Sequence, residues 1–146
     1  MLRKLHLSLC VIFLLGIASQ VQACSCVRKN GTPEYYYSRA TQVFVARVVA
    51  TREIAQRGDQ SKRAGVAATF TLGEVLKGNP RHLRTIESGY GNGDCGVPLL
   101  VGSTYVFFTG PDREVNICNG THAHVAGYAP HDELLQKLRA LNTSAR

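Results

Sequence analysis

Residues 42–52 read QVFVARVVATR, and the architecture expected for this chain follows from them. Valine, phenylalanine and alanine occupy both alternating sets of positions, so neither face of an extended strand here would be wholly polar. This pattern is typical of a strand that is buried on both sides, and a strongly curved barrel strand has the same pattern. We therefore predict a strand over residues 42–52 with apolar neighbours on both of its faces.

The rest of the chain contains further strand signals separated by loop signals. Residues 53–63 are polar and charged around Gly58, which predicts a long hairpin loop, and Lys77-Gly78-Asn79-Pro80 predicts a turn. Residues 89–96 contain four glycines and are expected to be a loop that carries Cys95. Four more strands are predicted over residues 65–76, 83–88, 103–109 and 114–117.

Two helices are expected at the ends of the strand-rich region. Thr32-Pro33-Glu34 combines a hydroxyl N-cap, a proline at the first helical position and an acid in the first turn. It predicts a short helix that reaches Ala40. Over residues 132–142, Asp132 can cap a helix whose apolar stripe consists of Leu134, Leu135, Leu138 and Leu141.

These elements predict a mainly β fold in one domain. Five short strands with a short N-terminal helix and a C-terminal helix favour a closed, five-stranded Greek-key barrel of the oligonucleotide/oligosaccharide-binding (OB) type. A two-sheet sandwich is the alternative that the number of strands leaves open.

The beginning of the chain is typical of a secretory signal peptide. Arg3 and Lys4 precede the apolar residues 7–17, and Val21-Gln22-Ala23 fits a cleavage site. We therefore expect residues 1–23 to be removed, and residues 24–146 to form a secreted, extracellular or periplasmic domain. No later stretch is apolar for the roughly 20 residues that a transmembrane helix needs.

The expected mature chain retains Cys24, Cys26, Cys95 and Cys118. An even number of cysteines in an oxidising compartment predicts two disulfides, for which three connectivities are open. At a free N-terminus, the α-amine has a pKa of about 7.7–8.0, so a useful fraction is neutral near neutral pH. Such an amine and the carbonyl of the same residue can chelate a zinc ion that has an open coordination position.

Several short motifs carry a resemblance to a known family. Cys24-Ser25-Cys26 precedes the expected helix and first strand, Cys95-Gly96 ends the glycine-rich loop, and Cys118-Asn119-Gly120-Thr121 follows the last strand. This arrangement resembles the tissue inhibitors of metalloproteinases and the wider netrin-like domains, which share a five-stranded barrel. The chain lacks the third disulfide and the cysteine-rich second domain of the animal inhibitors, and is more similar to single-domain bacterial homologues.

The resemblance implies disulfides Cys24–Cys95 and Cys26–Cys118. It also implies that Cys24, Ser25, Cys26, Asp94 and Cys95 contact a zinc metalloprotease. In that arrangement Cys24 would bind the zinc of the protease, Ser25 would enter the first specificity pocket, and Asp94 and Cys95 would support them. The expected function is therefore that of a metalloendopeptidase inhibitor.

Two alternatives to this function stay open. The disulfides could serve only a structural or adhesive module of the cell envelope, with no inhibitory activity. Val21-Gln22-Ala23-Cys24 also loosely matches a lipidation motif, so a lipid anchor at Cys24 is the other alternative. Lipidation would acylate the amine and abolish the chelate.

Other classes of function find no support in the sequence. No serine, cysteine or carboxylate stands in a recognisable nucleophile or acid–base setting, so we expect no enzyme and no cofactor. His122 and His124 have no identifiable third ligand, and we expect them to be surface residues. Tyr35, Tyr36 and Tyr37 are consecutive and cannot share one helix face, so we expect one to be buried and no nucleic-acid partner.

Overall fold

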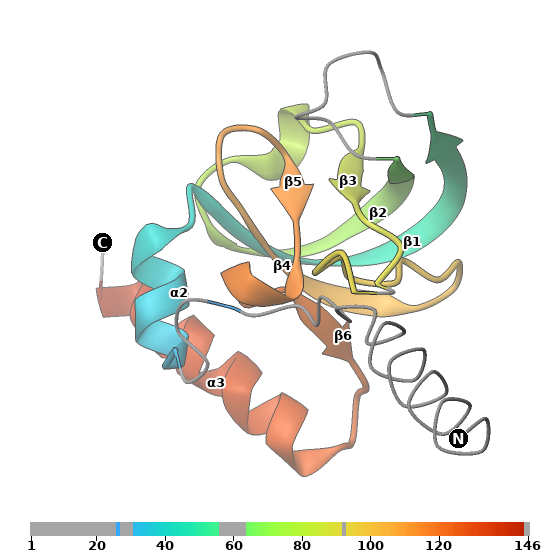
Figure 1. Cartoon of the computed structure of the whole chain (residues 1–146). Helices are drawn as coiled ribbons and strands as arrows, with labels where there is room; N and C mark the ends of the chain where they lie inside the picture. The colour runs from blue at the N-terminus through green and yellow to red at the C-terminus, as the bar shows by residue number, and fades with distance from the viewer. Residues whose placement is uncertain (1–25, 27–30, 56–63, 92, 145–146) are drawn as a thin grey trace, which may run out of the picture.

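Over the part of the chain that the structure describes, the fold is mainly β, with one curled sheet and two helices on its outer side (Figure 1). The computed structural model describes residues 26, 31–55, 64–91 and 93–144. Within these ranges no helix is long and apolar enough to cross a membrane. The principal elements are α2 (Pro33–Arg39), β1 (Gln42–Ile54), β2 (Gly65–Lys77), β3 (Ile86–Ser88), β4 (Thr104–Thr109), β5 (Glu114–Val115), β6 (His122–His124) and α3 (Ala129–Ser144), with short 3-10 turns η1 (Pro80–His82) and η2 (Ile117–Asn119).

The six strands form a single sheet in the order β5-β3-β2-β1-β4-β6. β1 pairs antiparallel with β2 on one side and with β4 on the other, whereas β3 and β5 are parallel. Irregularities in the β1–β2 register lie between Val43 and Phe44, Val45 and Ala46, and Val48 and Ala50. Such bulges bend a strand and increase its twist, which is how the sheet curls into a half-barrel (Figure 1).

The first part of β1, residues 42–46, is buried or half-buried on both faces, as its sequence predicted, whereas Arg47 and residues 49–53 are exposed, so the prediction does not hold for the rest of the strand. Phe44, Ala46 and Val48 belong to an inner hydrophobic cluster inside the curl of the sheet. Val43 belongs to an outer cluster between the sheet and the helices, and the partly buried Val45 packs against it. The inner cluster also contains Ala68, Ile86, Val97, Leu99, Tyr105, Phe107 and Val115, and the outer one contains Tyr37, Ala40, Leu76, Val106, Phe108, Leu135 and Leu138.

Both predicted helices are present. The Thr32 hydroxyl accepts a hydrogen bond from the Tyr35 amide at 3.3 Å, so Thr32 is the N-cap of α2. Tyr37 is buried, and its hydroxyl donates to the Leu76 carbonyl at 2.8 Å. α3 begins at Ala129, before the expected start, which places Asp132 in its first turn rather than at its N-cap.

The prediction of five strands in a closed barrel is wrong in two respects. β6 was not predicted, because three residues are too few to give a periodic pattern. In the described ranges no ladder joins β5 to β6, so the sheet is a half-barrel with two edges. The sandwich alternative is also wrong, since all six strands belong to one sheet.

Three predicted segments have different ends in the structure. The strand expected over residues 83–88 is reduced to Ile86–Ser88, since η1 and an irregular segment precede it. The strand expected over residues 114–117 ends at Val115, because Ile117 already belongs to η2. β1 continues to Ile54, into the segment predicted as a loop, and residues 56–63 of that loop lie outside the described ranges.

The uneven burial of side chains along β1 predicts unequal effects of two truncations in this strand. Phe44 is completely buried, whereas Val49 is 49% exposed. Phe44→Ala should lower the free energy of unfolding by about 3–5 kcal/mol, because it leaves a cavity among packed aromatic rings. Val49→Ala should change it by no more than about 0.5 kcal/mol. Denaturant unfolding under oxidising conditions measures both, and equal effects would contradict the packing described here.

Candidate functional site

A disulfide between Cys26 and Cys118 ties the start of the described chain to η2. The two cysteines are 92 residues apart in sequence, and their Cα atoms are 5.3 Å apart. Closing a loop of this length stabilises a fold by about 4–5 kcal/mol in the chain-entropy model. Of the two disulfides that the resemblance implies, this one is present in the structure. Cys24 and Ser25 lie outside the described residues, so the Cys24–Cys95 pairing stays a prediction.

Asp94 organises the glycine-rich loop. Its carboxylate accepts hydrogen bonds from the backbone amides of Tyr90 at 2.6 Å, Gly91 at 2.9 Å and Gly96 at 2.9 Å. Burial by itself raises the pKa of the Asp94 carboxyl, but the backbone hydrogen bonds outweigh it and lower the pKa from its usual value. The carboxylate is therefore occupied within its own loop, and Asp94 acts by holding the loop in shape.

This loop lies directly beside η2. The Ile117 amide donates to the Cys95 carbonyl at 2.9 Å, and Gly96 forms a β-bridge with Asn116. The Asn116 side chain in turn accepts hydrogen bonds from the amides of Cys118 and Asn119 at 2.9 and 3.0 Å. The structure thus brings Cys26, Asp94 and Cys95 together around Cys118, although Cys26 and Asp94 are far apart in sequence.

The loop geometry predicts a local effect of removing the Asp94 carboxylate. In Asp94→Ala, the amides of Tyr90, Gly91 and Gly96 lose their acceptor, so their hydrogen exchange should accelerate at least tenfold. Amides of β1 should keep their protection. Asp112→Ala, which removes an exposed carboxylate from the turn between β4 and β5, is the matched control and should leave the three amides unchanged. Unchanged exchange in Asp94→Ala would contradict the organising role of this side chain.

Three histidines form a cluster where β6 meets α3. The ring of His131 lies 5.9 Å from that of His122 and 6.0 Å from that of His124, measured between centroids. The side chain of His124 is only 8% exposed and approaches Asp132 at 3.7 Å. The expectation that His122 and His124 are surface residues is therefore wrong, because the first turn of α3 covers them. Among the described residues, no group of histidine, cysteine or acidic side chains is arranged to hold a metal ion.

The environment of His122 disfavours its charged form. Burial is the main cause of a lowered pKa, and the nearby His131 and His124 lower it further, against a hydrogen bond at 2.7 Å to the Gly120 carbonyl that raises it. The Nε2 atom of His122 and the Nδ1 atom of His124 are buried, and neither has a hydrogen-bond partner in the described part of the chain. The folded state therefore disfavours protonation of His122.

The lowered pKa of His122 predicts that mild acid destabilises the fold. Above the unfolded-state pKa of about 6.5, His122 is neutral in both states and contributes no pH dependence. As the pH falls below that value, the unfolded state binds a proton that the folded state resists, so stability decreases. Urea denaturation between pH 7.5 and 5.5 should show this decrease.

Two variants test whether His122 is responsible. His122→Gln should reduce the loss of stability between these two pH values, whereas His82→Gln, at an exposed histidine, should not. A pH dependence that is identical in wild type and His122→Gln would show that the buried histidine is not its source.

No family model matches this chain, and no curated protein matches it either. The case for a function therefore depends on the geometry around Cys118 and on the sequence of the N-terminal segment.

Proposed function

We propose that this chain is a secreted, netrin-like module that inhibits a zinc metalloprotease through a mature N-terminus at Cys24. The single observation that carries the proposal is the Cys26–Cys118 disulfide beside the loop of Asp94 and Cys95. It provides a rigid anchor two residues after the proposed zinc-binding residue.

The anchor limits how far the N-terminus can lie from it. Two residues of extended chain span at most about 7 Å, so the amine of Cys24 would stay close to Cys26. We propose that Cys24 then pairs with Cys95, whose carbonyl is hydrogen-bonded to Ile117 next to Cys118. A terminus held by two disulfides would lose little conformational entropy on binding, which favours affinity.

The proposed contact with the protease uses the backbone of Cys24. Its neutral amine and its carbonyl would displace the water from the open coordination position of the catalytic zinc. Ser25 would enter the adjacent specificity pocket of the protease. Asp94 would not bind the metal, because its carboxylate already accepts three backbone hydrogen bonds.

A one-residue extension of the N-terminus tests this mechanism. Protein that begins at Cys24 should inhibit at least one member of a panel of zinc endopeptidases, and an added alanine before Cys24 should weaken the inhibition at least a hundredfold. The extension removes the chelate, because the amine then belongs to another residue. An alanine added after Arg146 is the matched control and should leave the inhibition unchanged.

Two outcomes would contradict the mechanism. One is equal potency of the extended protein, and the other is no inhibition of any protease by protein with an unmodified Cys24. The intact mass of the exported protein distinguishes the alternatives. A free N-terminal cysteine agrees with inhibition, whereas an added diacylglycerol would indicate an anchored structural module.

A further inference from the structure

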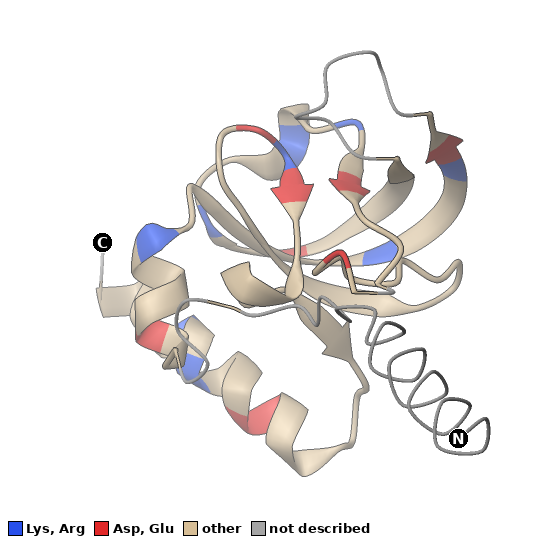
Figure 2. Cartoon of the chain, viewed as in Figure 1, with Lys and Arg blue, Asp and Glu red and all other residues tan. Residues whose placement is uncertain are grey.

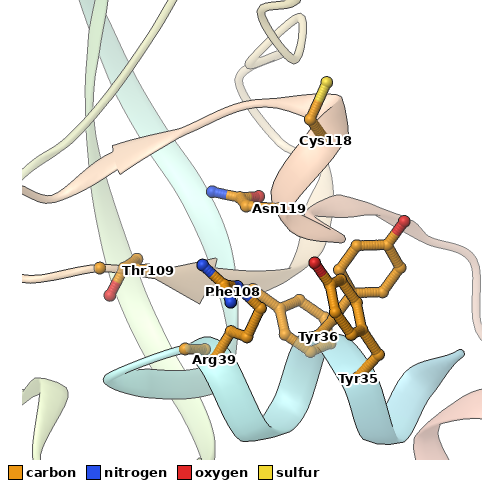
Figure 3. A pocket seen from close by; sticks show the side chains of 9 residues that line it. Tyr35, Tyr36, Arg39, Phe108, Thr109, Cys118 and Asn119 are labelled. Carbon is orange, nitrogen blue, oxygen red and sulfur yellow. The ribbon is translucent and has the colours of Figure 1, made fainter. Parts of the chain in front are cut away.

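A cavity of about 210 Å³ lies between α2, the end of β4 and η2 (Figure 3). Its main walls are Tyr35, Tyr36, Arg39, Phe108, Thr109 and Asn119. The cavity borders Cys118 but uses none of the residues proposed to contact a protease. An inference about its ligand therefore does not depend on the proposed inhibition.

One wall of the cavity is aromatic and held in place by packing. The rings of Tyr35 and Tyr36 meet edge to face at 5.5 Å between centroids, and those of Tyr36 and Phe108 do so at 6.3 Å. Phe108 is buried in the outer hydrophobic cluster. Tyr36 packs directly against Gly120, which has a φ of 95°, and a Cβ atom at that position would lie 2.7 Å from Cγ of Tyr36. These rings present a preformed apolar surface to the cavity.

Arg39 supplies a positive charge to the cavity. Its guanidinium lies 5.8 Å from the centroid of the Tyr35 ring, and no acidic side chain of the described residues forms an ion pair with it. Arg139 provides the contrast within the same protein, since it holds Glu74 with two hydrogen bonds at 2.9 and 2.7 Å. The charged group at this cavity is thus available to an external anion.

A neutral polar group accompanies the guanidinium. Figure 3 shows the side chains of Arg39 and Asn119 directed into the same space. Thr109 also lines the cavity, but its hydroxyl oxygen is buried and is not counted among the groups that a ligand could reach. The cavity therefore combines one cation and one neutral polar side chain with an aromatic wall.

We infer that this cavity binds a small carboxylate with an aromatic or similarly planar body. The planar fork of a guanidinium matches the two oxygens of a carboxylate, and stacked rings cover a flat apolar body well. Since an apolar cavity of about 150 Å³ can bind benzene, a cavity of about 210 Å³ suits a molecule of the size of benzoate. The full chain has a formal net charge of +7, and the expected mature chain, without Arg3 and Lys4, keeps 15 basic and 10 acidic side chains, or +5, which also favours an anion over a cation.

Titration of the purified protein with benzoate tests the inference. Saturable NMR shifts are expected at the amides of Arg39, Gly110 and Asn119, with a Kd of the order of 1 mM, as expected for a ligand of nine non-hydrogen atoms. Benzamide has the same shape without the charge and should bind at least tenfold more weakly. Arg39→Gln should weaken benzoate binding at least tenfold, and Arg84→Gln, at an exposed arginine outside the cavity, should not.

Arg39 is exposed, so Arg39→Gln should leave the chemical shifts of amides outside the cavity as they are in the wild type. Its effect on the titration then reports on binding alone. The inference would be overturned by the absence of saturable shifts with benzoate. Equal binding of benzoate to Arg39→Gln, or equal binding of benzamide, would overturn it as well. A titration with inorganic phosphate completes the test. Shifts of the same amides at an affinity equal to that of benzoate would overturn the inference, because they would show a simple anion site that does not select a planar body.

Discussion

The structure depends on the burial of one strand on both of its faces. β1 supplies Phe44 and Val48 to the core inside the curled sheet, and Val43 to the core beneath the helices. Both cores form only when the backbone of β1 is placed correctly. A slip of β1 by one residue would exchange its two faces and misplace both cores together. Figure 1 shows β1 within the curled sheet, and its ladder partners β2 and β4 connect it to the two edges of the half-barrel.

The regions with functional potential lie at the periphery of this arrangement. The disulfide, the Asp94 loop and the cavity all adjoin η2, where β4 and β5 have ended and regular ladders no longer pair the backbone. Among the described residues, Figure 2 shows basic and acidic positions on both the sheet and the helices. The geometry around η2 is therefore the feature of the described residues on which both proposals depend.

Much of the fold could be predicted from the sequence, because strong local patterns determine it. β1 has apolar residues on both faces, and Thr32-Pro33-Glu34 marks the start of α2. β6 could not be predicted, since its strand character comes from pairing with β4. The site could be predicted only in part. The cysteines in the sequence indicate where the site lies. The proximity of Arg39 to Asn119, and of His131 to His122, depends on tertiary packing that no local pattern encodes.

The pairing of β1 has a consequence for the order in which the molecule matures. Its neighbour β2 begins at Gly65, but its other neighbour β4 begins only at Thr104, so a nascent chain carries β1 and β2 before β4 exists. During that interval the edge of β1 that pairs with β4 has no ladder partner, and unpaired strand edges are prone to aggregate. Cys118 lies beyond β4, so the disulfide with Cys26 can form only after the last partner of β1 has been synthesised.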